Sequence, residues 1–211
     1  MILVRQIQVG SMANFSYLLT NPTEKIGTVI DPGWAGEEVD RTIKVAEKVG
    51  ISIKHIINTH THYDHIGGIN EMMKKTGADF YVHGEEATQS GIKDRKLLND
   101  GDRLDLDGLT VQVIHTPGHS PGGICFYVEG KLFTGDTLFV GGCGRADLPR
   151  SDPHQLYSSL YNKILSLPDE TVIYPGHNYG ERPTSTVGIE RKSNPYLTCD
   201  SINEFLRRRM G

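Results

Sequence analysis

The sequence predicts an α/β protein in which two β-sheets pack face to face and helices cover the outer face of each sheet. The order of the elements indicates this, because strands, a helix, a strand and a helix are followed by a similar second series. Many strands are only half apolar, and packing two sheets together would bury their apolar faces. The sequence has no linker, low-complexity segment or short repeat, so we expect one domain over residues 1–211.

Apolar patterning defines the elements of the first half of the chain. Alternating or short apolar runs predict strands at residues 2–9, 14–19, 27–30, 53–58 and 80–82. Apolar residues at helical spacing predict helices at residues 37–49 and 66–77, with a helical turn at residues 85–90. Gly50 and Gly77 can end the two helices, because glycine is common just after a helix.

Two turn sequences organise the second half. Asp107-Gly108 and Glu129-Gly130 each separate two apolar runs, which predicts two hairpins. The paired strands would be residues 104–106 with 109–114, and residues 124–128 with 131–133. We also expect a strand at residues 171–174 and helices at residues 153–165, 186–191 and 202–209. Ser151 or Asp152 would cap the first of these helices.

Composition excludes several functional classes. The chain is 37% hydrophobic and 23% charged, as in globular proteins, and its net charge of −4 argues against a nucleic-acid-binding surface. The N-terminus lacks the features of a signal peptide, and no apolar run approaches the roughly 20 residues of a membrane span. Cys125, Cys143 and Cys199 form no C-x-x-C pair, which favours a reducing compartment. We therefore expect a cytoplasmic protein that binds neither nucleic acid nor a membrane.

The stretch from Thr59 to Gly68 contains a dense set of metal-ligand residue types. His60 and His62 are two positions apart, so on an extended strand end their side chains point the same way. In a helix they would lie about 200° apart. Asp64 and His65 then point elsewhere and could serve a second ion. Clusters of histidine and carboxylate suit zinc and also iron.

Three later strands each end in a further ligand type, and a glycine precedes it every time. These pairs are Gly118-His119, Gly135-Asp136 and Gly176-His177. Glycine permits unusual backbone angles and close approach of two chain segments. Together with the first cluster, the three pairs predict one metal centre assembled from strand ends.

Other polar residues have two interpretations or a structural one. Asp31, in a sharp turn with Pro32 and Gly33, either bonds local backbone or supports a metal ligand from behind. Cys143 is either a small packed residue or a redox-sensitive thiol. The remaining histidines are interpreted as structural: His55, His83, His115 and His154.

The motif H-x-H-x-D-H at residues 60–65, followed by His119, Asp136 and His177, resembles the metallo-β-lactamase superfamily. The resemblance implies a four-layered αββα sandwich with a metal site at one edge, between the two sheets. It also implies the ligands of two ions: His60, His62 and His119 for the first, Asp64, His65 and His177 for the second, and Asp136 as the bridge.

Two zinc ions held in this way would flank a shared water. Such a water becomes hydroxide near neutral pH and can attack a carbonyl carbon. A carboxylate suits the position between two cations, and a second one could orient the water. The expected catalytic carboxylates are therefore Asp136 and Asp64.

Three further segments resemble the glyoxalase II-like branch of the superfamily, the hydroxyacylglutathione hydrolases: residues 133–139, 142–145 and 175–179. In that branch a basic residue and a tyrosine hold glutathione, which implies substrate-binding roles for Arg145 and Tyr179. A surface ion pair for Arg145 and simple packing for Tyr179 are the alternatives. The resemblance implies a hydrolase that cleaves a thioester or ester of a small acidic compound.

Two features depart from that branch. Only residues 196–211 follow Pro195, so we expect the C-terminal glutathione-binding helical domain of glyoxalase II to be absent. Asp147 stands where the branch has a second tyrosine, and its carboxylate would repel an acidic thiol. The expected partner is therefore a small-molecule thioester or thiol-derived substrate, with glutathione itself open. The chain is expected to act as a monomer or homodimer.

The alternative is an iron enzyme on the same fold. Several segments, including residues 142–147, 185–187 and 190–191, also resemble the persulfide dioxygenases, which use one Fe(II). The resemblance implies His62, His119 and Asp136 as its ligands, a set typical of oxygenases. One Fe²⁺, or a mixed Fe/Zn pair, is the corresponding alternative to two Zn²⁺.

The hydrolase is preferred because Tyr63 and residues 66–68 look more like that branch. A metal-binding module that works beside a flavin redox protein ranks last, because no flavin-binding segment is fused here.

Overall fold

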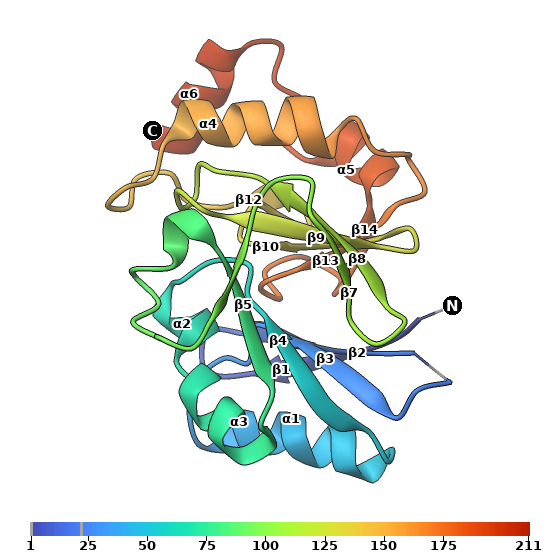
Figure 1. Ribbon diagram of the computed structural model, residues 1–211. Helices are drawn as coiled ribbons and strands as arrows, with labels where there is room; N and C mark the ends of the chain where they lie inside the picture. Colours follow the sequence, from blue (N-terminus) through green and yellow to red (C-terminus); the bar gives the residue numbers. More distant parts are fainter. Residues whose placement is uncertain (1, 22) are drawn as a thin grey trace.

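The computed structural model describes residues 2–21 and 23–211 and has the four expected layers, helix, sheet, sheet, helix (Figure 1). The first sheet has the strand order β1-β2-β3-β4-β5-β6. Its first three strands are antiparallel neighbours, and the next three join in parallel. The strands are β1 (Leu3–Val9), β2 (Asn14–Thr20), β3 (Ile26–Ile30), β4 (Ser52–Ile57), β5 (Asp79–His83) and β6 (Lys96–Leu98).

The second sheet has the order β14-β13-β10-β9-β8-β7. All its pairs are antiparallel except β10 with β13. Its strands are β7 (Arg103–Asp105), β8 (Thr110–His115), β9 (Ile124–Val128), β10 (Lys131–Gly135), β13 (Val172–Pro175) and β14 (Ser185–Thr186). A separate two-stranded ribbon joins β11 (Leu138–Phe139) to β12 (Gly142–Cys143).

Helices cover the outer face of each sheet (Figure 1). The first sheet is covered by α1 (Glu37–Lys48) and α3 (Ile69–Thr76), and the short α2 (Tyr63–Ile66) lies at its edge. The second is covered by α4 (Pro153–Ser158), its π-helical continuation η2 (Ser159–Ile164), α5 (Val187–Ser193) and α6 (Ile202–Met210). No helix in the described part of the chain is long and apolar enough to cross a membrane.

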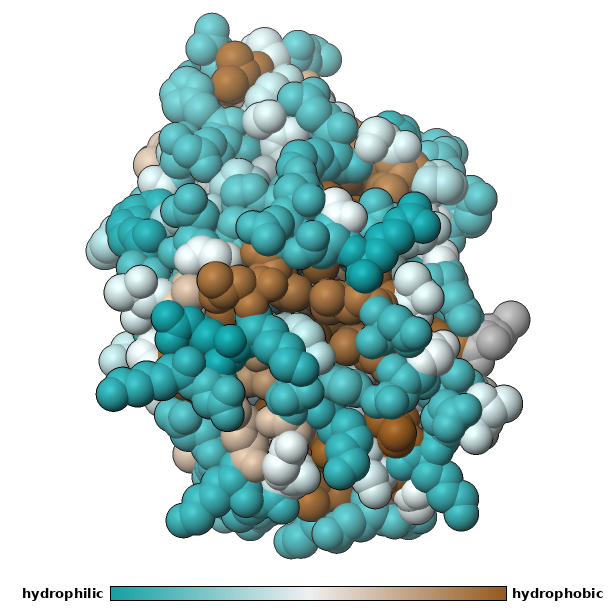
Figure 2. All heavy atoms as spheres, viewed as in Figure 1, coloured by the Kyte–Doolittle hydropathy of each residue, from teal (hydrophilic) through white to brown (hydrophobic). Residues whose placement is uncertain are grey.

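Three apolar clusters hold the layers together, because successive strand residues face opposite sides of a sheet. On β2, Tyr17 joins the cluster between the two sheets, whereas Leu18 joins the cluster under α1 and α3. Phe205 of α6 belongs to the third cluster, on the outer face of the second sheet. Figure 2 shows hydrophobic residues as a band across this face, between the two halves of the molecule.

The structure confirms the predicted layers and differs in several element boundaries. The predicted helix at residues 66–77 is two helices, α2 and α3, interrupted at Gly67-Gly68. A side chain at position 68 would collide with Val39, so this glycine lets α2 and α1 approach closely. The helical turn expected at residues 85–90 is only the 3₁₀ turn η1 (Gly84–Glu86). Asp152, not Ser151, caps α4, because its Oδ1 accepts hydrogen bonds from the backbone amides of His154 and Gln155.

All three cysteines are free and buried. Cys143 lies in the cluster around Leu156 and Phe205, so it is a packed residue. Burial raises the pKa of the Cys125 thiol to about 11 and that of Cys143 to about 12. Both thiols therefore stay protonated at neutral pH, and the thiolate is the reactive form.

We expect iodoacetamide to leave Cys125 and Cys143 unmodified in the native protein at neutral pH. Mass spectrometry of tryptic peptides checks this, and the same reagent in guanidinium chloride should modify all three cysteines. Rapid labelling of Cys143 in the native protein would contradict its packed, protonated state.

Candidate metal centre

The predicted ligands meet at one edge of the sandwich, where strands of both sheets end. From the first sheet, β4 ends at Ile57 and leads into the loop with His60 and His62. From the second, β8 leads toward His119, Asp136 directly follows the last residue of β10, and His177 lies two residues after the end of β13. The topology thus gathers residues far apart in the sequence at one place.

His60 and His62 follow the strand end instead of lying on it. The backbone of His62 is extended, with φ −69° and ψ 147°, and it forms the N-cap of α2. The two rings are 4.6 Å apart between centroids. The predicted convergence of the two imidazoles is therefore kept, although the regular strand stops earlier.

The ligand-type atoms form two groups that share no residue, and a third set, Asp31, His60 and His65, overlaps both. In each group they lie within 4.8 Å of one another. The groups are His60, His62 and His119, and Asp64, His65 and His177.

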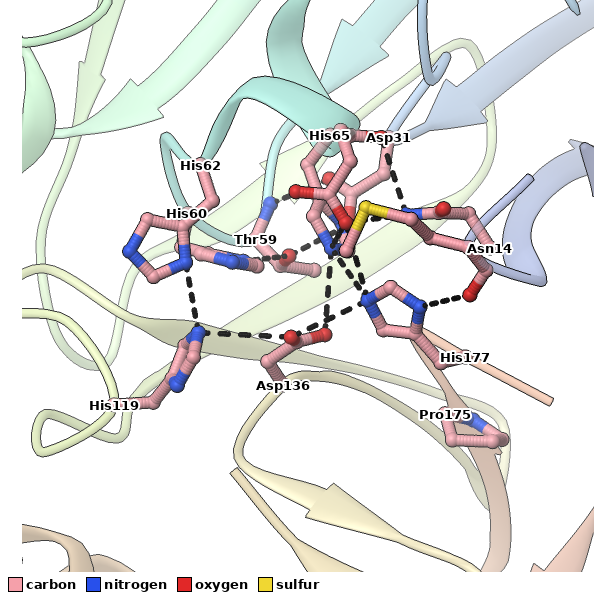
Figure 3. A network of polar contacts seen from close by, with 12 residues as sticks. Asn14, Asp31, Thr59, His60, His62, His65, His119, Asp136, Pro175 and His177 are labelled. Atoms are coloured by element: carbon pink, nitrogen blue, oxygen red, sulfur yellow. Dashed lines mark hydrogen bonds and ion pairs between the residues drawn. The ribbon is translucent and has the colours of Figure 1, made fainter. Parts of the chain in front are cut away.

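The carboxylate of Asp136 lies between these groups (Figure 3). Its Oδ2 is 3.5 Å from His119 Nε2 and 3.4 Å from His177 Nε2. Its Oδ1 is 3.3 Å from His65 Nε2. Asp136 therefore contacts a member of each group, as a bridging ligand would.

Hydrogen bonds behind four imidazoles fix which ring nitrogen faces the centre. The Nδ1 of His119 donates to the carbonyl of Arg145, and the Nδ1 of His177 to the carbonyl of Met12, both at 2.9 Å. A carbonyl can only accept, so Nδ1 carries a proton, and Nε2 is the nitrogen left to bind a cation once its own proton is lost. Such outer contacts are typical of metal-binding histidines.

Asp31 supplies the same support to the first cluster. His65 Nδ1 donates to Asp31 Oδ2 at 2.9 Å. The Thr59 hydroxyl also donates to that oxygen at 2.6 Å, which leaves it to accept from His60 Nδ1 at 3.0 Å. Asp31 has a positive φ of 49° at the end of β3. Asp31 is therefore both a turn residue and a support for predicted ligands.

The buried nitrogens that face the centre fit a cation. His60 Nε2 is buried and has no hydrogen-bond partner among the described residues. His62 Nδ1 and His119 Nε2 face each other at 2.8 Å, and the Nε2 atoms of His65 and His177 at 3.3 Å. Nitrogen and carboxylate donors of this kind, closely grouped and buried, suit zinc or iron.

Burial and charge set the protonation of the site. Burial, with the positive charge of His65, lowers the pKa of His60, which keeps that imidazole neutral and able to ligate. Burial would raise the pKa of Asp136. The charge of His65 and hydrogen bonds with His177 and His65 outweigh this effect, so the pKa of Asp136 lies well below its usual value. Burial would lower the pKa of His177, but hydrogen bonds with Asp136 and Asp64 raise it to about 9.

Close approach explains a glycine that precedes a predicted ligand. A methyl group at Gly176 would overlap Asp136 Oδ1. Gly135, with φ 47°, leaves room for the Thr59 side chain. These two glycines let β10, β13 and the loop after β4 pack tightly enough to bring their ligand residues together.

The comparisons with known proteins agree with this geometry. The model of the metallo-beta-lactamase superfamily matches residues 9–177, which includes all seven predicted ligands. The chain belongs to the metallo-beta-lactamase superfamily.

Relatives within the superfamily carry two kinds of activity. The hydroxyacylglutathione hydrolase GloC of Haemophilus influenzae is 35% identical over 198 residues, covering 84% of this chain and 90% of the relative. The human mitochondrial persulfide dioxygenase ETHE1 is 32% identical over 209 residues, covering 98% of this chain and 80% of the relative. The crystal structure of ETHE1 from Myxococcus xanthus matches with a TM-score of 0.91 at 30% identity, covering 99% of this chain and 90% of that one.

Asn14 is a polar contact of this superfamily site that sequence reasoning missed. Its Nδ2 donates to Asp64 Oδ2 at 2.8 Å and to the Asp64 carbonyl at 3.2 Å. Asn14 is 2% exposed and opens the fully buried strand β2. A polar residue at the start of such a strand was the available signal.

The two predicted substrate-binding residues differ in their surroundings: Tyr179 contacts a predicted ligand, and the Arg145 side chain is paired at the surface. The Arg145 guanidinium makes a two-pronged ion pair with Asp147, with distances of 2.9 and 2.7 Å. Tyr179 is 57% exposed, and its ring stacks on His177 with centroids 4.6 Å apart. The surface ion pair expected as the alternative for Arg145 is therefore present, and Tyr179 both packs on the predicted ligand His177 and faces solvent.

Replacing Asn14 with alanine is expected to lower kcat by about 10- to 100-fold, the usual range for a contact that holds a ligand. Asp64 would lose the side-chain donor that fixes its Oδ2. Steady-state kinetics with matched metal content check this. Asn178→Ala, which removes a surface amide bonded to Gln8, is the control. An unchanged kcat in Asn14→Ala would show that Asp64 needs no such support.

Proposed function

We propose that this protein is a metal-dependent hydrolase that cleaves a thioester or ester of a small acidic compound. One observation carries the proposal: the Asp136 carboxylate lies between two largely buried groups of three ligand-type residues each. A site for one ion would need only one of these groups. The presence of both favours two ions, the arrangement used for hydrolysis.

In this proposal His60, His62 and His119 would hold the first zinc ion, Asp64, His65 and His177 would hold the second, and Asp136 would contribute to both. Bound zinc would lower the pKa of a water so that hydroxide is available near neutral pH, and would polarise the substrate carbonyl. The hydrogen bonds from behind keep the imidazole lone pairs directed at the centre.

Asp64 is proposed to orient the attacking water. Asn14 holds one of its oxygens, and that oxygen is 3.3 Å from His177 Nε2. Hydrogen bonds with His177 and Asn14 and the charge of His65 outweigh burial and lower the pKa of Asp64 far below its usual value, so it stays ionised and can accept a hydrogen bond. Asp64 and Asp136 are thus the proposed catalytic carboxylates.

Substrate contacts at the rim are proposed for Tyr179 and Arg145. The ring of Tyr179 stacks on His177, and the residue is partly exposed to solvent. Arg145 would have to exchange Asp147 for a substrate carboxylate, and because their pair is exposed this exchange costs little.

A second candidate is persulfide oxygenation with one iron. His62, His119 and Asp136 alone form a two-histidine, one-carboxylate set: the two imidazole nitrogens are 2.8 Å apart and His119 is 3.5 Å from Asp136. The 32% identity to human ETHE1 over nearly the whole chain supports this candidate.

The variant His177→Ala separates the two candidates. Hydrolysis with two ions requires His177, so thiol release from an S-acylglutathione should fall to background. Oxygenation through His62, His119 and Asp136 does not use His177, so oxygen uptake with glutathione persulfide should persist. Metal content of each protein, measured on the same preparation, shows whether the variant lost one ion or both.

A further inference from the structure

A pocket of about 490 Å³ opens beside His62, and its lining includes neither Tyr179 nor Arg145. This volume is within the range of small-ligand pockets, about 300–1,000 Å³. Its walls are largely apolar and include Tyr63, Ile66, Pro121 and Pro149. Because His62 is a proposed ligand, a molecule in this pocket would lie next to the reacting centre.

One cation lines this pocket. Arg150 is exposed, and its guanidinium has no hydrogen-bond or ion-pair partner among the described residues. Arg145, five residues earlier, is by contrast paired with Asp147. An unpaired guanidinium beside apolar walls suits a carboxylate at the end of an aliphatic chain.

The backbone at Arg150 is strained. Its φ is 69°, in the left-handed region that an arginine seldom adopts. The amide of Asp152 donates to the Gly118 carbonyl at 2.7 Å, which ties this segment to the loop that carries His119. Strain of this kind is often kept where a side chain has a binding role.

The carboxylate of Glu86, the other charged residue of the pocket wall, is already hydrogen-bonded and does not face an anion in the pocket unpaired. Glu86 is 2% exposed. Its Oε1 accepts from the amide of Gly122 at 3.0 Å, and its Oε2 from the hydroxyl of Thr61. The Glu86 carboxylate is therefore occupied with the two loops that carry His62 and His119.

We propose that this pocket binds a short aliphatic chain that ends in a carboxylate, with the carboxylate on Arg150 and the chain along Tyr63, Ile66 and Pro149. For the reaction, this inference rests on the proposed hydrolase function. The chain belongs either to the acyl group or to the thiol of the substrate.

Three thioesters of matched length test the proposal and separate these two sources. S-butyryl-N-acetylcysteamine has no carboxylate, S-succinyl-N-acetylcysteamine has one on the acyl side, and S-butyryl-3-mercaptopropionate has one on the thiol side. We expect the metal-loaded protein to prefer one of the carboxylated compounds over the neutral one by about 10- to 100-fold in kcat/KM, as an ionic hydrogen bond allows.

The variant Arg150→Gly should abolish this preference while leaving kcat/KM for the neutral thioester unchanged. Glycine favours the positive φ, so the same variant should have a higher Tm, and loss of selectivity cannot then be ascribed to misfolding. Arg103→Ala removes the same charge from exposed β7 and should keep the preference. A preference that survives in Arg150→Gly, or none in the wild type, overturns the proposal.

A binding measurement keeps the pocket testable if no thioester is cleaved. Trp34 is the single tryptophan and stacks on Tyr63, with ring centroids 6.3 Å apart. Binding of the unreactive thioether 4-(ethylthio)butanoate should change the fluorescence of Trp34 until the pocket is saturated. Arg150→Gly should weaken the binding of this thioether about 10-fold or more. Equal binding to both proteins would refute the pocket, whereas binding without hydrolysis would refute only the proposed reaction.

Discussion

Replacing Asp136 with asparagine is expected to lower the hydrolysis rate on the order of 10³-fold or more, which is about 4 kcal/mol of transition-state stabilisation. Asparagine keeps the shape of the side chain and removes its charge. The carboxylate lies within 3.5 Å of imidazole nitrogens of both ligand groups, so its loss should weaken both ion sites. Steady-state kinetics and metal analysis of the same samples measure the two effects.

The metal-free form of this variant has a separate readout. Asp136 is a main cause of the raised pKa of His177, so that pKa should fall from about 9 toward its ordinary value. An NMR titration of the histidine Cε1–H signals checks this. Asp79→Asn, which removes an exposed carboxylate paired with Lys96, is the matched control. Full activity in Asp136→Asn would exclude a bridging role.

Replacing Asp31 with alanine is expected to reduce the free energy of unfolding by about 4 kcal/mol. Asp31 is 3% exposed and accepts four hydrogen bonds, from Asn58 Nδ2, the amide and hydroxyl of Thr59, and His65 Nδ1. Alanine would leave these buried donors without an acceptor. Alanine is also disfavoured at the positive φ of this position.

Urea unfolding measures this loss, with an unchanged m-value if the unfolded state is unaffected. Asp31→Asn keeps an acceptor oxygen and tolerates the positive φ, so its loss should be about half as large. Asp94→Ala, at an exposed position, should have little effect. A change below about 1 kcal/mol in Asp31→Ala would mean that the four donors find other partners.

Length and periodicity decide how much of the fold the sequence can predict. Helix α1 and strands such as β2 and β4 carry an apolar pattern over five residues or more, and their predicted ranges lie close to the observed ones. Strands β6, β11, β12 and β14 have only two or three residues, which is too short for a pattern. Tertiary pairing alone makes them strands.

The residues of the candidate site also divide into those that the sequence predicts and those that only the fold brings together. Histidines and aspartates at strand ends are visible in the sequence because their residue types are rare in such density. Arg150 gave no signal and Asn14 only a weak one, a polar residue that opens a buried strand, because the roles argued for them depend on which loops the fold brings beside them. The pairing of Arg145 with Asp147 is local and was foreseen only as an alternative.

A direct comparison of two reactions tests the central claim, that two ions bridged by Asp136 perform hydrolysis. The metal-loaded protein is assayed for thiol release from an S-acylglutathione and a simple S-acyl-N-acetylcysteamine, and for oxygen uptake with glutathione persulfide. We predict thiol release that depends on Asp136 and His177, with no oxygen uptake above background. Oxygen uptake at enzymatic rates without thioester cleavage would contradict it.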